Sequence, residues 1–89
     1  DMAFRIVPNP AGNYAQILFS ATSQEAITIR IYSVTGNLIR EWTLHPASGL
    51  NCIQWDLTDQ NKRKVKQGMY FCSLFSGTEH KTARISVVP

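Results

Sequence analysis

The chain has 89 residues, of which 44% are hydrophobic and 17% are charged. A chain of this length forms one domain and buries only about 60 to 65% of the surface that its unfolded form exposes. The apolar content is enough for one core, and the charge content is too low for a disordered chain. Nine Lys and Arg face six Asp and Glu, and four of the nine lie between positions 62 and 66. The basic character is therefore local and says little about the domain as a whole.

No apolar run approaches the ~20 residues that are needed to span a bilayer. The first ten residues, DMAFRIVPNP, lack the charged and apolar regions of a signal peptide. We therefore expect no membrane insertion, and an N-terminal export signal of a parent protein would lie outside this sequence.

Two short strands are predicted near the start of the chain. FRIV, residues 4–7, is followed by Pro8-Asn9-Pro10. Because proline cannot serve a central ladder, FRIV is expected to be a short edge strand. AQILFS, residues 15–20, is the next predicted strand.

A β-hairpin is the clearest local pattern. ITIRIYSV, residues 27–34, alternates isoleucines with polar residues, which is typical of a half-buried strand. Thr35-Gly36-Asn37 supplies residues that tolerate positive φ, so Gly36 and Asn37 are the expected turn determinants. LIREWTL, residues 38–44, completes the hairpin, and its alternation places Trp42 on one face with Leu38, Arg40 and Leu44.

Three further strands follow. NCIQWDL, residues 51–57, places Ile53, Trp55 and Leu57 on one face. MYFCSLFS, residues 69–76, is entered through Gly68, whose backbone freedom suits that entry, and its Tyr70 is expected to bury its ring while its hydroxyl finds a backbone partner. Gly77-Thr78-Glu79 then marks a tight turn into HKTARISVV, residues 80–88.

These elements together predict the fold class. About seven short strands, rich in Ile, Val, Thr and aromatics and separated by turn signals, favour an all-β chain. No stretch repeats apolar residues with helical spacing over a useful length. We expect residues 1–89 to form a single antiparallel two-sheet sandwich of immunoglobulin-like type.

The two cysteines are expected to be free. By alternation Cys72 shares a face with Tyr70 and Leu74, whereas Cys52 lies opposite Ile53. The thiols should then point to different sides of their sheets, and a disulfide needs closely placed Cβ atoms. Cys72 is the one expected to be buried.

The basic cluster consists of Lys62, Arg63, Lys64 and Lys66. Such a cluster can neutralise phosphates, and nucleic-acid proteins interleave basic groups with aromatics on an exposed face. Here the nearest aromatics belong to the flanking strands. We therefore interpret the cluster as a solvated loop that aids solubility, suppresses edge pairing or contacts an acidic partner, and we expect no nucleic acid.

Metal binding and catalysis find little support in the residues. Asp56, Asp59 and Asn61 carry oxygen ligands at close spacing, and a calcium loop would need several such groups to converge on one point. The cations that follow would repel the ion, so these residues are interpreted as turn formers. His45 and His80 lie 35 positions apart in or beside turns. No nucleophile or phosphate-loop signature occurs. We expect no enzyme activity, no metal and no cofactor.

An ordered pattern runs along the chain: Pro8-Asn9-Pro10, the stretch IRIYSVTGNLI at 29–39, Gly68-Met69-Tyr70-Phe71, and a last strand begun by Lys81. This pattern resembles the C-terminal sorting domain of type IX secretion substrates in Bacteroidetes. The run Trp55-Asp56, Asp59-Gln60-Asn61, Val65, Gly68-Met69-Tyr70 is also similar to the immunoglobulin-like domain of the flagellar hook-capping protein, although Lys62 stands where that pattern has glycine.

The resemblance implies an address and not a catalyst. It implies a sandwich that ends a larger exported protein, passes through the periplasm, is recognised by the outer-membrane type IX translocon and is removed by a surface sortase-like peptidase. The protein would then be secreted or held at the cell surface. The residues that the resemblance suggests for translocon recognition are Gly68, Tyr70, Lys81, Arg84, Val87 and Val88.

The last strand can also be considered on physical grounds. Residues 81–88 are expected at a sheet edge, where exposed backbone groups can pair with a partner's strand. A weak homodimer through edge strands is possible in the same way. Two other functions stay open at this point: an adhesive or carbohydrate-binding module that uses aromatics such as Trp42, and a structural spacer of a cell-surface protein.

Overall fold

The computed structural model describes residues 3–21 and 26–89, which form strands and loops without a helix. The strands are β1 (Phe4–Val7), β2 (Ala15–Ala21), β3 (Ile27–Ser33), β4 (Leu38–Leu44), β5 (Gly49–Trp55), β6 (Gly68–Ser76) and β7 (Glu79–Val87). The prediction of an all-β fold with seven strands is confirmed, and the ranges differ from the predicted ones by one or two residues at their ends.

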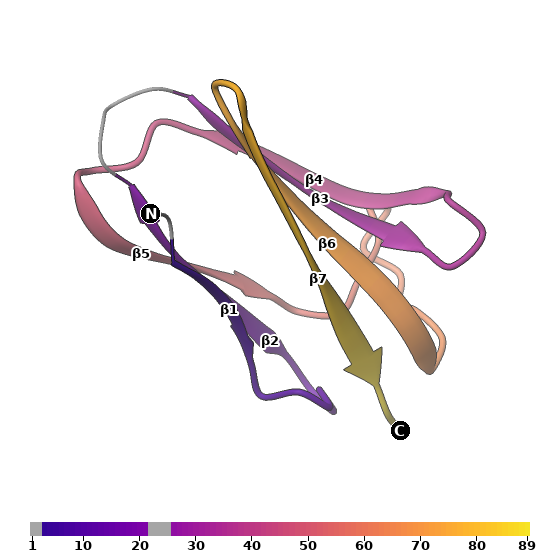
Figure 1. Ribbon diagram of the computed structural model, residues 1–89. Helices are drawn as coiled ribbons and strands as arrows, with labels where there is room; N and C mark the ends of the chain where they lie inside the picture. Colours follow the sequence, from indigo (N-terminus) through magenta and orange to yellow (C-terminus); the bar gives the residue numbers. More distant parts are fainter. Residues whose placement is uncertain (1–2, 22–25) are drawn as a thin grey trace.

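The strands form two antiparallel sheets that pack face to face (Figure 1). One sheet has the order β1-β2-β5 and the other the order β4-β3-β6-β7. β3 pairs with both β4 and β6, so the chain crosses between sheets before it returns beside β3. This arrangement is the predicted immunoglobulin-like sandwich. Among the described strands, four lie at sheet edges: β1 and β5 in one sheet, and β4 and β7 in the other.

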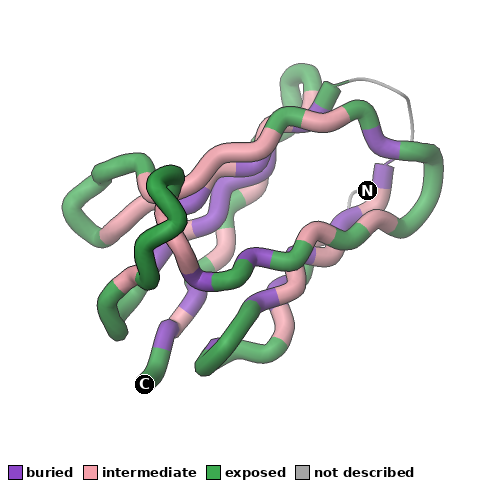
Figure 2. The backbone as a smooth tube through the Cα atoms, turned by 180° about the vertical axis from the view of Figure 1, so that it is seen from behind, coloured by how far each residue is buried: buried purple, intermediate pink, exposed green. Residues whose placement is uncertain are grey.

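The core lies between the two layers. Buried residues alternate with less buried ones along strands of both sheets (Figure 2). Strict alternation in β2 and β3 sends every second side chain inward, as a half-buried antiparallel sheet requires. The largest completely buried side chains include Trp55, Phe19 and Leu74. Cys72 is buried and Cys52 is exposed, and both are free, as predicted. Burial raises the pKa of the Cys72 thiol to about 12, so this thiol stays protonated and behaves as a small apolar side chain.

One face assignment from the sequence is wrong. Leu38 was expected to share the face of Trp42, but it is 49% exposed, whereas Ile39 packs against the core. The register between β3 and β4 shifts, because Ile31 faces Arg40 while the next residue faces Leu38. Ile39 is therefore the extra residue of a β-bulge, which reverses the alternation at this end of the strand.

The predicted strand at 51–57 also ends earlier than expected. β5 stops at Trp55, yet Leu57 is still buried. Leu57 reaches the core with φ of 63°, a left-handed conformation that is uncommon for a branched side chain. The sequence thus predicted that Leu57 faces the core, but it did not predict the left-handed backbone conformation of this residue.

The N-terminal segment that follows β1, residues 8–11, connects the three-stranded sheet to β7 of the four-stranded sheet. After β1 the chain passes through Asn9 and Ala11, and Ala11 forms a parallel bridge with Val87 of β7. β1 and β7 belong to different sheets but lie on the same side of the sandwich (Figure 1). The segment that follows β1 is in this way bound to β7. Within the described residues, no helix could span a membrane.

Candidate functional site

The last strand, β7, occupies the position that the sequence analysis anticipated, at an edge of the four-stranded sheet. It pairs along its whole length with β6, from Glu79 opposite Ser76 to Val87 opposite Gly68. A two-residue turn at Gly77-Thr78 connects the strands, and Gly77 has φ of 59°. The free side of β7 faces away from β6, so its backbone groups are the ones that a partner strand could reach.

The six candidate recognition residues come together along this pair of strands but differ in exposure. Tyr70 and Val87 are buried, at 7% and 6% exposure. Gly68, Arg84 and Val88 are exposed. Lys81, the remaining candidate, is half-buried and lies opposite Leu74. A partner of the folded domain could therefore reach the exposed candidates directly, whereas Tyr70 and Val87 are enclosed in the core.

Tyr70 forms the corner where the basic loop, residues 58–67, enters β6. Its hydroxyl donates a hydrogen bond to the backbone carbonyl of Lys66 at 2.6 Å. Its ring meets Trp55 edge to face, with 5.9 Å between ring centroids and an interplanar angle of 72°. Burial raises the pKa of the Tyr70 hydroxyl, which keeps this donor protonated. The predicted buried ring with a backbone partner is confirmed.

The C-terminal half of the β7 edge is closed by the N-terminal segment. The Asn9 side chain donates from Nδ2 to the Arg84 carbonyl at 3.0 Å and accepts at Oδ1 from the Ser86 amide at 2.9 Å. Ala11 donates its amide to the Ser86 carbonyl at 2.7 Å and accepts from the Val88 amide at 2.9 Å. These four bonds occupy the outward groups of β7 from the Arg84 carbonyl onward.

The basic loop is exposed but well ordered by backbone bonds. One Asp59 carboxylate oxygen accepts from the amides of Asn61 and Arg63, at 2.9 and 3.0 Å. Gln60 binds the edge of β4 through its amide and its side chain. Lys62 has φ of 66°, which is the conformation that glycine adopts most easily. The hook-capping pattern has glycine at this position, and the backbone conformation of Lys62 is one that favours glycine.

Asp56 also serves the loop. Its carboxylate accepts from the Thr58 hydroxyl and amide, and Arg40 approaches it at 3.4 Å. The Thr58 hydroxyl bond is the main cause that lowers the pKa of Asp56, and the Arg40 charge lowers it further. The carboxylates of Asp56 and Asp59, which could have been calcium ligands, therefore accept hydrogen bonds from nearby groups of their own loop, as turn formers do.

The alternative sites gain no support from the geometry. In residues 3–21 and 26–89, no three His, Cys, Asp or Glu side chains gather as a metal centre. His45 and His80 are both exposed, and His80 stacks on Phe75 with 4.5 Å between ring centroids. Trp42, the proposed sugar contact, packs against the core, and the Arg40 guanidinium lies 5.1 Å from its ring centroid.

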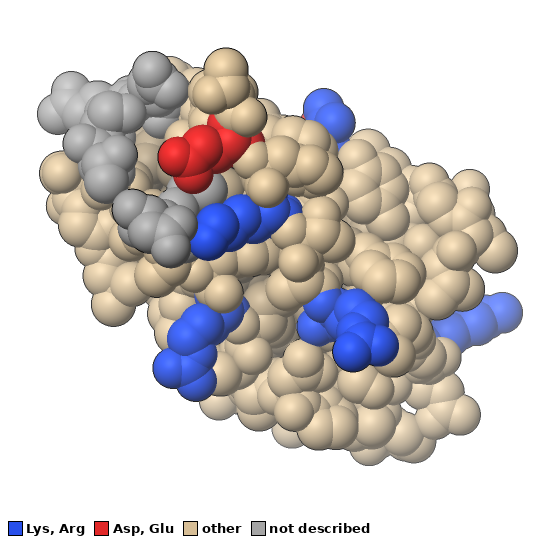
Figure 3. Space-filling view, in the orientation of Figure 1, with Lys and Arg blue, Asp and Glu red and all other residues tan. Residues whose placement is uncertain are grey.

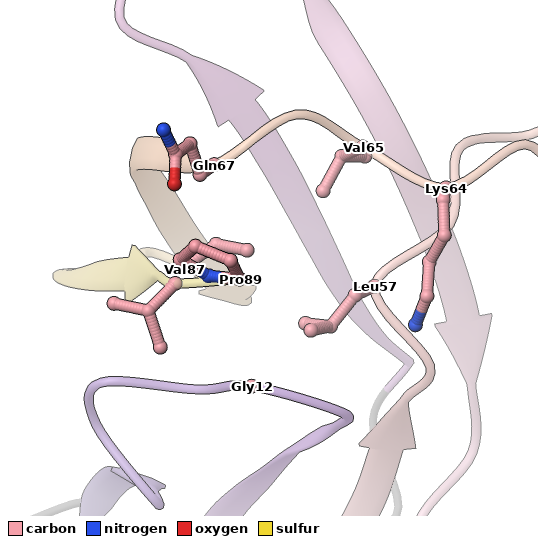
Figure 4. Close-up of a pocket in the computed structure, with 8 residues that line it drawn as sticks. Gly12, Leu57, Lys64, Val65, Gln67, Val87 and Pro89 are labelled. Atoms are coloured by element: carbon pink, nitrogen blue, oxygen red, sulfur yellow. The ribbon is translucent and has the colours of Figure 1, made fainter.

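A shallow pocket of about 330 Å³ opens where the chain's last residues meet the basic loop (Figure 4). Leu57 and Val65 line one side, and Val87 and Pro89 line another, with Gly12 below them in the view. Its lining is mostly apolar, and Lys64 stands at its margin. The basic loop and the end of β7 are thus neighbours, a proximity that the sequence did not predict.

Positive charge is spread over the surface around β7. On the face shown in Figure 3, which is seen as in Figure 1 with β7 in front, Lys and Arg side chains outnumber acidic ones and lie apart from one another. Arg84 forms no ion pair with any described carboxylate. A partner that meets this side of the domain would be favoured by negative charge.

The sequence reasoning missed the part played by Asn9. In the sequence Pro8-Asn9-Pro10 indicates the end of a strand and is part of the family pattern, yet Asn9 forms hydrogen bonds with residues more than 70 positions away. A short polar residue between two prolines, next to an apolar strand, was the available signal. It indicates a fixed turn but does not indicate which strand the turn will meet.

Fold and site together define a small sandwich module that presents its last strand at a sheet edge. A family model described as a secretion system C-terminal sorting domain matches residues 5–88. The chain belongs to this family, and the resemblance stated from the sequence is confirmed. No curated protein matches the chain.

Two solved structures from Porphyromonas gingivalis contain a similar fold. Dimeric latent PorU matches with a TM-score of 0.77 and 22% identity over 98% of this chain. PorZ, described as an essential bacterial surface component of the type IX secretion system, matches with a TM-score of 0.72 and 16% identity over 97% of this chain. The chain spans 9% and 11% of the lengths of those two proteins. At these identities the likeness concerns the fold.

Proposed function

We propose that this domain is a non-catalytic address that ends a larger exported protein and directs it through the outer-membrane type IX translocon to the cell surface. The cargo would cross the periplasm first, and a sortase-like peptidase would remove the domain after export. The observation that carries the proposal is the family match over residues 5–88, because that family consists of C-terminal sorting domains.

The position of β7 supports the proposal physically. A sorting signal must present an accessible feature while the domain stays folded, and an edge strand offers unpaired backbone groups together with side chains. Arg84 and Val88 are exposed on and just beyond this strand. We assign direct contact with the translocon to them and to Lys81, and we assign a supporting role through the fold to Tyr70 and Val87.

An export assay tests the proposal. Residues 1–89 are fused behind a periplasm-targeted fluorescent reporter in a bacterium with a working type IX system, and the reporter is measured in periplasm, on the surface and in the medium. We expect the fusion to reach the surface or medium and the reporter alone to stay in the periplasm. Equal periplasmic retention of both would overturn the proposal.

Removing the last residues is a poor way to locate the signal, because a deletion of 81–89 also removes Ile85 and Val87 from the core. The double variant Arg84→Glu with Val88→Ser changes only exposed side chains. Leu50→Ser is its matched control, since Leu50 is 74% exposed on β5, an edge of the other sheet. We expect the double variant to be retained and the control to be exported. Export of the double variant at the unmodified level would remove Arg84 and Val88 from the contact.

A further inference from the structure

We propose that the open half of the β7 edge, residues 80–84, is a docking site for an extended strand of another protein, and that this strand alternates acidic and apolar side chains. The inference deepens the proposed function and rests on it for its biological role, since it states how the address would be contacted. The chemistry of the site itself can be tested on the isolated domain.

The ladder with β6 determines which groups of β7 point outward. The two-residue turn makes Ser76 and Glu79 a hydrogen-bonded pair, and such pairs then alternate along the strands. The backbone groups of the residues between them, His80, Thr82 and Arg84, therefore face away from β6. The bond from the Asn9 side chain to the Arg84 carbonyl confirms this direction.

The outward edge changes character at Arg84. From its carbonyl onward every outward group is bonded to Asn9 or Ala11. Before it, the amides and carbonyls of His80 and Thr82 and the amide of Arg84 have no partner among the described residues. Among residues 3–21 and 26–89, the segment with Asn9 and Ala11 thus closes one half of the edge, and no described group pairs with the outward backbone groups of the other half, where a strand could be added.

The other edges are less suited to this role. Gln60 occupies the edge of β4, where its amide donates to the Ile39 carbonyl and its side chain accepts from the Glu41 amide. β1 has only four residues. β5 has no charged residue that could select a partner. β7 combines open backbone groups with cationic side chains.

Charge decides which kind of strand fits. Arg84 lies on the outer face with His80 and Thr82, whereas Ala83 and Ile85 point toward the core. If two β7 strands paired about Thr82, Arg84 of one copy would stand opposite His80 of the other, and no carboxylate would meet either. A second copy is therefore disfavoured, and a strand with carboxylates on its outer face and apolar side chains on its inner face is favoured.

A recess marks the end of the site. It has a volume of about 330 Å³ and is lined by Asn9, Pro10, Met69, Arg84 and Ser86. It lies where the open half meets the closed half, so a docked strand would end there. Met69 is 37% exposed and offers an apolar wall beside the Arg84 charge.

The test uses a defined probe, the peptide acetyl-Thr-Val-Glu-Val-Glu-Val-Thr-amide, with a control peptide in which Lys replaces both Glu. Hydrogen exchange of single amides is followed by NMR on the isolated domain. We expect the acidic peptide to protect the amides of His80, Thr82 and Arg84 from exchange. The Lys peptide should bind about tenfold more weakly, because it places like charges beside Arg84.

Two pairs of variants separate the edge from the fold. Thr82→Pro removes an outward amide that β6 does not use, so it should preserve folding and abolish docking. Thr82→Ala is its matched control, since both variants lose the Thr82 hydroxyl bonds to Ser73 and His80. Arg84→Glu keeps every backbone group and should reverse the preference between the two peptides.

Each outcome decides the inference. The inference is supported if the acidic peptide protects the three amides, if Thr82→Pro abolishes this protection, and if Thr82→Ala retains it. The inference is overturned if millimolar peptide protects none of these amides, or if both peptides bind equally. It is also overturned if the amides become protected when the domain is concentrated without any peptide. In the export assay, an unmodified fusion and a folded Thr82→Pro fusion that are exported equally would overturn the docking site and leave the proposed function standing. Retention of the unmodified fusion would overturn the function, whatever the peptides do.

Discussion

Two neighbouring segments of the chain differ sharply in what they contribute. The loop at 58–67 contains most of the clustered positive charge, yet its four cations are exposed and its shape depends on backbone bonds to Asp59. β6, which begins at the next residue, contains no charged residue and places Tyr70, Cys72 and Leu74 in the core. The cluster of positive charge, which is the most conspicuous feature of the sequence, therefore lies outside the buried strand that determines the fold.

The physical reason is the difference between solvated charge and buried area. Exposed cations contribute little to stability, because water and salt screen them. A buried aromatic ring contributes several kcal/mol, since it removes a large apolar surface from water and fills a shaped space. The following variants sharpen this comparison, in order of decreasing effect.

Tyr70→Ala should have the largest effect. The substitution removes the ring that meets Trp55 and the hydroxyl that binds the Lys66 carbonyl. We expect the free energy of unfolding to fall by about 3 to 5 kcal/mol. Tyr70→Phe, which loses only the hydroxyl, should cost about 1 kcal/mol. Urea unfolding monitored by tryptophan fluorescence measures both, and an unchanged midpoint for Tyr70→Ala would contradict the buried corner.

Gly68→Ala should come next. Gly68 has φ of 145°, which L-residues rarely adopt, while a Cβ at this position would meet nothing within 4 Å. The cost is therefore one of backbone strain and not of collision, and we expect about 1 to 2 kcal/mol of destabilisation. Thermal unfolding measures it. A variant as stable as the original chain would show that β6 can be entered without glycine.

Lys62→Gly should have a smaller effect of opposite sign. Relief of the left-handed conformation at φ of 66° outweighs the greater chain entropy of glycine, so we expect a gain of about 0.5 to 1 kcal/mol. The neighbouring Arg63→Gly is the matched control, because Arg63 is not among the residues with positive φ. Destabilisation by Lys62→Gly in chemical unfolding would contradict this explanation.

The combined replacement of Lys62, Arg63, Lys64 and Lys66 with Ser should change stability least, by less than about 0.5 kcal/mol. The only side-chain bond that the structure describes for these cations runs from Lys64 to the Asp56 carbonyl at 3.2 Å. Circular dichroism and thermal unfolding check the result. Loss of the folded state would show that the loop is more than a connection.

The alternation of apolar and polar residues was sufficient to predict the strands and most of the buried positions, because a period of two determines on which face of the sheet a residue lies. It failed at Leu38, where the bulge at Ile39 shifts the register, and it did not foresee the left-handed backbone of Leu57. Bulges and positive φ depend on the partner strand and on packing, and neither is written in local periodicity.

The candidate site was predictable only in part. The edge position of the last strand was expected from the sequence, and the structure confirms it. The closure of half that edge by Asn9 and Ala11 did not, because these contacts join opposite ends of the chain. A single sequence contains no signal for such a pairing, and the division of β7 into an open and a closed half became visible only in three dimensions.

The most direct test of the central claim compares the two segments in the export assay. The four-serine loop variant and Tyr70→Ala are each fused to the periplasm-targeted reporter, and the exported fraction is measured beside the unmodified domain. The folded sandwich with its edge strand is predicted to be the signal, so the loop variant should be exported at the unmodified level and Tyr70→Ala should remain in the periplasm. Retention of the loop variant together with export of Tyr70→Ala would contradict the account.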